Sequence, residues 1–334
     1  MNLNKGDNIY KYRLDKKLGQ GSFGQVWLAT DTTIDSQVAL KILPAEFIHV
    51  AQILEEARNG HKVNHNNLLK IYYADIVSTT TAGVAIVIIA QEYHENGTIE
   101  SKLNSLNFLP LPRLLKILKD ILLGLEYLHN GGIIHNDIKP GNILLDKYGN
   151  GILADYGISG VSTDGSAIVA KSAYILHQAP ESKTTHNIDI QTDLYQIGCT
   201  AYRLANSVSD TTFSNYQPYV PKRLVSIIKK AMNEDRSKRY SSALEIRRDL
   251  EKLCFPGYWD SSSDGTLIGK GKKFDYKFEI IPKAIDLFDC NAYQKNRETN
   301  KVSKISKFCS KNLSKKEINK HQISFFDWVI NNAK

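Results

Sequence analysis

Three residues within a six-position segment have side chains suited to phosphoryl transfer. Asp137, Lys139 and Asn142 lie in the segment HNDIKPGN, residues 135–142, and an apolar run follows at residues 143–145. An aspartate can orient and deprotonate a hydroxyl, a lysine can neutralise a moving phosphoryl group, and an asparagine can bind a metal ion. Together they favour transfer from a metal-bound nucleotide, which none of them would indicate alone.

An upstream segment carries glycines in a spacing that suits phosphate binding. Residues 18–26 read LGQGSFGQV, with Gly19, Gly21 and Gly24 in G-x-G-x-x-G-x-V order. Glycines allow a tight turn and bring backbone N–H groups close to phosphate oxygens. In dinucleotide-binding folds a helix follows such glycines, whereas here residues 26–29 read as a second strand. The pattern favours a glycine-rich hairpin over a nucleotide; taken alone, it also fits a plain hairpin turn.

A single lysine, Lys41, interrupts the apolar run at residues 38–43. A buried lysine is costly unless it meets anions, which nucleotide phosphates or an acidic side chain would supply. A helical stretch from about residue 48 to residue 63 offers Glu55 and Glu56. The alternative for Lys41 is an edge-strand lysine that extends into water.

Further downstream, Asp155 follows the short apolar stretch at residues 152–154. A carboxylate at the end of a strand can ligate magnesium, although a turn aspartate without a ligand is an alternative. Ala-Pro-Glu at residues 179–181, a helix that begins near Asp193, and Arg239 come next in the chain.

In this order, the motifs resemble those of the eukaryotic-type protein kinase family over roughly residues 10–254. The resemblance implies an α+β, two-lobed fold: a β-rich lobe at about 10–92, a helical lobe at about 93–254, and the active site in the cleft between them. It also implies ATP and Mg²⁺ as cofactors and protein substrates phosphorylated on Ser or Thr, including the chain itself. A pseudokinase scaffold or binding module, or a small-molecule kinase, stays open as an alternative.

The resemblance assigns roles to single residues. Asp137 would be the catalytic base, with Lys139 beside it at the γ-phosphate, as in the Ser/Thr version of this loop. Lys41 would contact the α- and β-phosphates and pair with Glu56. The metal ligands would be Asn142 and Asp155. The residues that would bind the nucleotide are Leu18, Gly19, Gln20, Gly21, Ser22, Phe23, Gly24, Val26, Ala39, Lys41, Glu92, His94 and Leu144.

The resemblance also implies three supporting features outside the reacting groups. Gln91 would be the gatekeeper before the hinge at residues 92–94. Asp193 would brace the catalytic loop, and Glu181 would form a buried ion pair with Arg239.

Four positions depart from the family pattern. Asn136 replaces the arginine that binds a phosphorylated activation loop, so we expect activity that does not depend on loop phosphorylation. Tyr156 replaces a phenylalanine and adds a hydroxyl that needs a partner, with little functional effect expected. Gly60 replaces a bulky apolar residue, which predicts a helix weaker by about 1 kcal/mol and a packing gap. Tyr174 stands where a threonine is usual, which puts the peptide selectivity in doubt.

Apolar periodicity predicts the other main elements. Apolar residues recur with helical spacing from Leu114 to His129, after Pro110 and Pro112. A β run is predicted from Thr81 to Glu92, with its apolar centre at residues 84–89, after a turn at about residues 80–83. Helices are predicted at 224–232 and 242–253.

Composition is that of a soluble globular protein. The chain has 334 residues, of which 42% are hydrophobic. Its longest apolar stretch, at residues 82–90, is too short to span a bilayer, and residues 1–7 show no signal-peptide core. Four cysteines show no metal-ligand spacing. We therefore expect a cytoplasmic protein without a membrane span.

Residues 255–334 form a basic extension of unknown role. They hold 15 Lys and Arg against 9 Asp and Glu. The excess is greatest at residues 291–322, which hold nine basic and two acidic residues. Such a run could attract nucleic acid, an acidic lipid surface or an acidic protein, but a solvated surface is favoured, and aromatic residues for base stacking are sparse in this run. Residues 274–280 alternate as a strand. Ser314 and Glu317 have the form of a capping box, which opens a helix whose aromatic residues we expect to dock on the helical lobe.

Overall fold

The protein is described by a computed structural model that covers most of the chain. The described residues are 2–20, 24–44, 57, 60–78, 85–103, 108–156, 160–161, 168–169, 177–208, 212–262 and 264–333. The chain divides into two compact units: Met1–Ile99 with Leu123–Asp193, and Glu100–Leu122 with Leu194–Lys334. The predicted lobe boundary at residues 92 and 93 stays a prediction.

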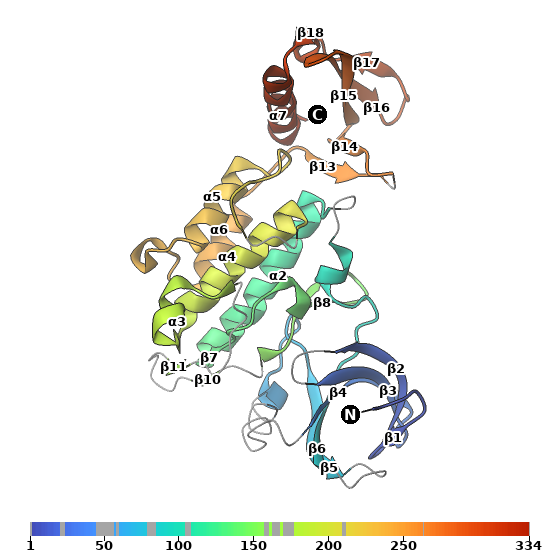
Figure 1. Ribbon diagram of the computed structural model, residues 1–334, viewed down its shortest axis with the longest axis vertical. Coiled ribbons are helices and arrows are strands. Elements are labelled where there is room, and N and C mark those ends of the chain that lie inside the picture. The colour runs from blue at the N-terminus through green and yellow to red at the C-terminus, as the bar shows by residue number, and fades with distance from the viewer. Residues whose placement is uncertain are drawn as a thin grey trace. The chain divides into compact units, whose positions relative to one another are not determined.

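A six-stranded antiparallel sheet forms the N-terminal part of the first unit (Figure 1), in the order β1-β2-β3-β4-β6-β5. Its strands are β1 (Asn8–Ile9), β2 (Tyr12–Gln20), β3 (Gln25–Asp31), β4 (Ser36–Pro44), β5 (Ile71–Ser78) and β6 (Ala85–Gln91). β6 confirms, over residues 85–91, the β run predicted from Thr81 to Glu92, while the turn predicted at about residues 80–83 lies outside the described residues.

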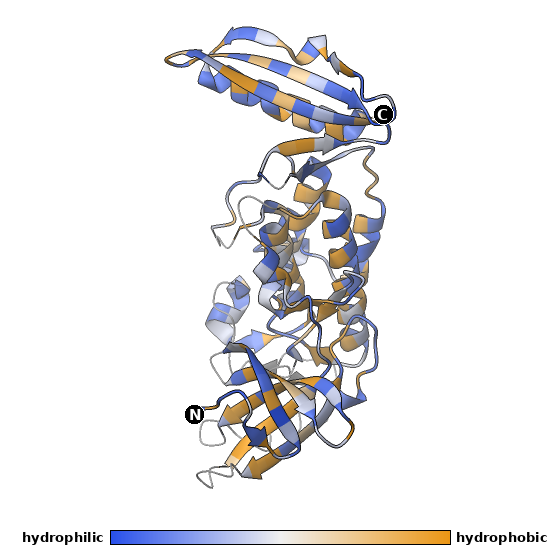
Figure 2. Cartoon of the chain, turned by 90° about the vertical axis from the view of Figure 1, so that its right-hand side faces the viewer, coloured by the Kyte–Doolittle hydropathy of each residue, from blue (hydrophilic) through white to orange (hydrophobic). Residues whose placement is uncertain are grey.

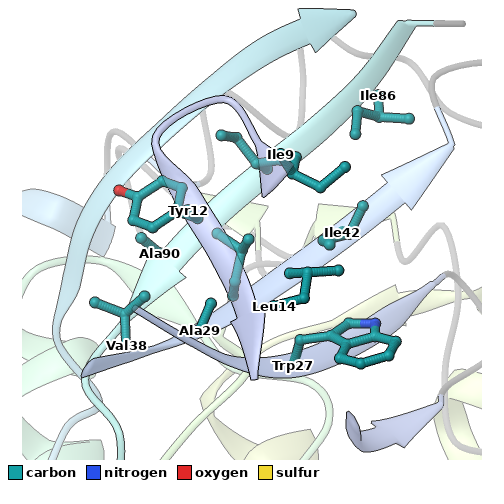
Figure 3. Packing of buried hydrophobic residues seen from close by; sticks show 11 residues of the cluster. Ile9, Tyr12, Leu14, Trp27, Ala29, Val38, Ile42, Ile86 and Ala90 are labelled. Carbon is teal, nitrogen blue, oxygen red and sulfur yellow. The ribbon is translucent and has the colours of Figure 1, made fainter. Parts of the chain in front are cut away.

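Side chains point alternately to opposite sides along the strands, which gives this sheet two different faces. One face buries an apolar cluster that includes Leu14, Trp27 and Ile42 (Figure 3). The next residues along the strands, such as Leu43 and Val87, belong to a second cluster. Because side chains alternate along a strand, Lys41 lies on the face opposite Ile42. Its ammonium is thereby kept out of the first apolar cluster.

Short elements follow in the first unit. They are β7 (Ile133–Ile134), the 3₁₀ turn η3 (Pro140–Asn142), β8 (Ile143–Leu145), β9 (Gly151–Leu153), β10 (Gly160–Val161), β11 (Ile168–Val169), α3 (Pro180–Thr185) and β12 (Asn187–Ile188). Of the helix predicted at residues 48–63, the structure describes residues 57 and 60–63; residues 57 and 60–62 are helical, and Val63 is not.

Longer helices complete the α+β architecture. They are α2 (Leu111–Asn130), α4 (Ile190–Asn206), α5 (Lys222–Ala231) and α6 (Ala243–Glu251), with the 3₁₀ turns η2 (Ile99–Lys102) and η6 (Arg236–Lys238). The predicted helices are confirmed, with ends that differ by up to three residues. No helix among the described residues is both long enough and apolar enough to cross a bilayer.

The C-terminal extension is a folded layer of sheet and helix. Its strands are β13 (Tyr258–Ser261), β14 (Leu267–Lys270), β15 (Phe274–Ala284), β16 (Leu287–Asn296), β17 (Val302–Lys304) and β18 (Ser310–Leu313); η7 (Ser306–Phe308) and α7 (Lys315–Asn332) complete it. β15 confirms the strand predicted at residues 274–280. The side chains of Ser314 and Glu317 form the predicted capping box at the start of α7.

Aromatic packing fixes this layer within the second unit. Phe325 and Phe326 of α7 share a buried cluster with Trp259, and Figure 2 shows the mixture of apolar and polar residues along the strands above the helix. The Trp259 indole donates to the Phe326 carbonyl at 3.3 Å. Phe108, before α2, and Tyr219, before α5, contribute to the same cluster, which confirms the predicted docking on the helical part.

Replacing Phe325 by alanine tests this packing. Phe325 is fully buried, so we expect Phe325→Ala to lower the free energy of unfolding by about 3 to 5 kcal/mol through lost burial and a cavity. Urea unfolding followed by tryptophan fluorescence measures the change. Ile285→Ala is the control because the Ile285 side chain is 97% exposed, and it should change little. Equal effects of the two substitutions would contradict the packing described here.

Candidate active site

The catalytic segment predicted from sequence lies between β7 and β8, and its three polar residues contact one another. Lys139 Nζ lies 2.9 and 2.8 Å from the two carboxylate oxygens of Asp137. Asn142 Nδ2 donates to the Asp137 carbonyl at 2.8 Å and to Asp137 Oδ2 at 2.7 Å. Ile138 points into the interior and is fully buried, which anchors the loop and leaves Asp137 at the margin of solvent.

A buried carboxylate, Asp193 near the start of α4, fixes the first half of this loop. Asp193 Oδ2 accepts from the backbone N–H of His135 at 2.8 Å, and Asp193 Oδ1 accepts from that of Asn136 at 2.7 Å. The His129 ring donates to Asp193 Oδ2 at 2.9 Å. The expected bracing role of Asp193 is thus seen directly as hydrogen bonds to the loop backbone.

His135 connects the loop to the segment before Asp155. Its Nε2 donates to the Ala154 carbonyl at 3.1 Å, and the N–H of Asp137 donates to its Nδ1 at 3.2 Å. These partners require a neutral ring with the proton on Nε2. Burial holds the pKa of His135 below its ordinary value, which keeps that form at neutral pH. Sequence reasoning missed this role, although His135 stands two residues before Asp137.

Lys41 and Asp155 form an ion pair between β4 and the residues after β9. Lys41 Nζ lies 2.6 Å from Asp155 Oδ1. Desolvation opposes ionisation of Asp155, but Lys41 and the other nearby groups together keep the pKa of Asp155 below its ordinary value. The predicted partner Glu56 lies outside the described residues, so the Lys41–Glu56 pair stays a prediction.

Asn142 and Asp155 offer the oxygen atoms that a magnesium ion prefers. The Ala154 N–H donates to the Asn142 carbonyl at 2.8 Å, so the backbones that carry the two residues are joined. Asn142 uses Nδ2 for Asp137, which leaves its Oδ1 without a donor among the described residues. An amide oxygen and an ionised carboxylate suit Mg²⁺, which takes few protein ligands and completes its shell with phosphates and water.

The predicted nucleotide-contacting side chains of the sheet share the face that carries Lys41. Val26 lies opposite Lys41 in the β3–β4 ladder, and Ala39 precedes Lys41 by two positions, so all three point to the same side. Val26, Ala39 and Leu144 of β8 are only partly buried, which leaves apolar surface available to a ligand. Leu18 at the end of β2 is 40% exposed.

The glycine-rich segment is described in part. Gly19 and Gln20 are exposed at the end of β2. A Cβ on Gly24 would lie 2.1 Å from the Ile42 carbonyl oxygen, so the approach of β3 to β4 requires glycine there. Gly21, Ser22 and Phe23 lie outside the described residues, and their predicted phosphate contacts stay predictions.

The predicted hinge follows β6 directly. Gln91, the predicted gatekeeper, is 8% exposed and lies opposite Ala39. The Glu92 N–H donates to the Lys70 carbonyl at 2.9 Å, and the His94 ring lies 3.7 Å from the Glu92 carboxylate. Both residues are partly buried, in keeping with a position beside a ligand.

The structure decides two of the four departures from the family pattern. The Tyr156 hydroxyl finds its partner in the Leu69 carbonyl at 2.5 Å. The packing gap expected at Gly60 is wrong: a Cβ there would lie 2.5 Å from Ile71 Cδ1 and 3.2 Å from Tyr156 Cε2, so these side chains fill the space.

The structure describes the departure at position 136 but leaves the one at position 174 and the predicted Glu181–Arg239 ion pair untested. The Asn136 backbone has φ +62°, a left-handed conformation that asparagine tolerates well. Tyr174 lies outside the described residues. Glu181 and Arg239 belong to different units, and their ion pair stays a prediction.

Comparison with known proteins agrees with this geometry. Residues 12–253 match the protein kinase domain family. The chain belongs to the protein kinase family. The sheet-rich N-terminal part followed by helices is the α+β arrangement expected of this family.

Curated kinases from several bacteria are similar to this member of the protein kinase family. A probable serine/threonine-protein kinase of Streptomyces coelicolor is 30% identical over 273 residues, which cover 74% of this chain and 40% of the relative. Probable serine/threonine-protein kinase PknB of Bifidobacterium longum is 29% identical, with 72% and 39% covered. Serine/threonine-protein kinase PknB of Mycobacterium leprae is 26% identical, with 73% and 43% covered. The matched part of the chain thus spans about two fifths of these relatives.

The burial of neutral His135 predicts that the stability of the protein depends on pH. Its folded pKa lies below the unfolded value of about 6.5, so the unfolded chain binds the proton first as the pH falls below 6.5. The free energy of unfolding should therefore fall with pH by up to about 1.4 kcal/mol per unit between those two pKa values. Urea unfolding at a series of pH values should give a flatter dependence for His135→Asn. An unchanged slope would contradict the prediction.

Proposed function

We propose that this kinase transfers the γ-phosphoryl group of ATP to serine and threonine hydroxyls of proteins. The observation that carries the proposal is the cluster of Asp137, Lys139 and Asn142, in the same unit as the Lys41–Asp155 pair. All the candidate site residues that are described belong to this unit.

In the proposed reaction, Asp137 orients the acceptor hydroxyl and takes its proton. The hydroxyl oxygen bonds to the γ-phosphorus, the bond from that phosphorus to the β–γ bridging oxygen breaks, and ADP leaves. Lys139, already in contact with both Asp137 oxygens, neutralises the charge of the transferred group. The backbone N–H of Asp137 donates to Nδ1 of neutral His135, which keeps Asp137 in place.

The remaining residues hold the nucleotide and its metal. Lys41 would bind the α- and β-phosphates in place of its contact with Asp155. Asn142 and Asp155 would hold Mg²⁺, which would supply positive charge against the phosphates. The apolar face at Val26, Ala39 and Leu144 suits the adenine ring, with hydrogen bonds from the hinge at residues 92–94.

Protein hydroxyls are proposed as acceptors, including serines and threonines of this chain. Two observations support Ser/Thr specificity: the lysine at position 139, and the relatives named as serine/threonine-protein kinases.

Removing the proposed base tests the reaction. Asp137→Asn keeps the size of the side chain but not its ability to accept a proton, and it should lower phosphoryl transfer by about 10²- to 10⁴-fold. Transfer of radiolabel from ATP to the chain and to a generic basic protein measures this, and phosphoamino-acid analysis should identify phosphoserine or phosphothreonine. Asp286→Asn, in an exposed turn of the extension, is the control and should retain full activity.

Two outcomes would contradict the proposal. No transfer by the wild type to itself, to proteins or to small acceptors would favour a scaffold without catalysis. Transfer to a small molecule alone, with no labelled protein, would favour a small-molecule kinase.

Asn136 predicts that activity is independent of phosphorylation. A neutral side chain cannot form the charge-assisted clamp that an arginine makes with a phosphate group. The enzyme should therefore have equal activity before and after phosphatase treatment, with treatment verified by intact mass. A large fall in kcat/KM after dephosphorylation would show that another cation replaces the arginine.

A further inference from the structure

We propose that the Tyr156 hydroxyl is a positioning group that holds Asp155 in its metal-binding place, a larger effect than we expect from the sequence alone; this inference rests on the proposed role of Asp155. The hydroxyl donates to the Leu69 carbonyl at 2.5 Å, and the Tyr156 side chain is buried. The two residues are 87 positions apart in the chain. The bond therefore ties the residue after Asp155 to a distant segment.

Asp155 needs such support because its backbone is in a disfavoured conformation. Its φ is +60°, in the left-handed region, which aspartate tolerates better than most residues but at a free-energy cost that contacts with the surroundings must offset. The residue before it, Ala154, is held by the catalytic loop: its N–H donates to the Asn142 carbonyl, and its carbonyl accepts from His135. Tyr156 holds Asp155 from the other side.

The carbonyl that accepts this hydrogen bond is itself fixed. The Leu69 N–H donates to the Leu153 carbonyl at 3.0 Å, and the Leu153 N–H donates to the Asn67 carbonyl at 2.9 Å. Leu153 is the last residue of β9, two positions before Asp155. The chain connects Leu153 to Tyr156 through Asp155, the Tyr156 hydroxyl bonds to Leu69, and Leu69 bonds back to Leu153. These links form a closed loop that contains Asp155.

Gly60 explains why the ring of Tyr156 can reach this position. A side chain at residue 60 would begin 3.2 Å from Tyr156 Cε2, tighter than ordinary contact, and would also displace the end of Ile71. The glycine and the tyrosine are therefore complementary: the small residue leaves room for the ring, and the hydroxyl fixes the ring there.

The experiment compares Tyr156→Phe with a matched control, Tyr202→Phe. Both substitutions keep the aromatic ring and remove a hydroxyl that donates to a backbone carbonyl at 2.5 Å, but Tyr202 bonds to Asn215 in the other unit. Metal binding is measured by Mn²⁺ electron paramagnetic resonance in the presence of ADP, without catalysis. Thermal unfolding of both variants measures the structural cost.

We expect Tyr156→Phe to weaken Mn²⁺ binding about three- to tenfold, the loss that corresponds to one hydrogen bond. Tyr202→Phe should bind Mn²⁺ like the wild type while losing a similar amount of thermal stability. Wild-type Mn²⁺ affinity in Tyr156→Phe would overturn the inference and leave the proposed function intact. A wild-type protein that binds no Mn²⁺ with ADP would instead overturn the metal-binding role on which the inference rests.

Discussion

The geometry of the candidate site depends on the buried carboxylate of Asp193. A carboxylate away from water is stable only when hydrogen-bond donors surround it, and here the donors are the backbone N–H groups of His135 and Asn136 and the ring of His129. The carboxylate therefore requires the loop in this shape as much as the loop requires the carboxylate. His135 extends the constraint to the N–H of Asp137 and to the carbonyl of Ala154, next to Asp155.

This arrangement explains why the loop keeps its shape with Asn136 in place of a cation. The bond from residue 136 to Asp193 comes from its backbone, which any residue except proline supplies. Its φ of +62° suits asparagine better than most residues, and the side chain is only 2% exposed. A guanidinium so deeply buried would need an anion beside it, whereas a neutral amide needs only hydrogen bonds. The shape of the loop is thus fixed from α4, independently of a charge at this position.

The structural features that were predicted correctly from the sequence are those formed by residues close together in the chain. Asp137, Lys139 and Asn142 lie close together because a short loop and one 3₁₀ turn connect them. The helical spacing of apolar residues in α2 and the capping box of α7 likewise involve residues only a few positions apart. The partner of Tyr156 and the side chains that fill the space beside Gly60 could not be predicted in this way, because Leu69 and Ile71 reach them only through pairing with β9 and β6. Strand β16 was missed because polar residues such as Asp289, Asn291 and Gln294 obscure its alternation.

The basic composition of the extension has a structural explanation that requires no anionic partner. β17 lies at the edge of the C-terminal sheet, and all three of its residues are exposed. Open edges pair readily with other strands, and lysines disfavour such pairing because their charges would be brought together and desolvated. Lys304 lies on this edge, while Lys301 and Lys307 flank it and are also exposed. The aromatic cluster beneath stabilises the layer, and the lysines at its edge keep it from pairing with other chains.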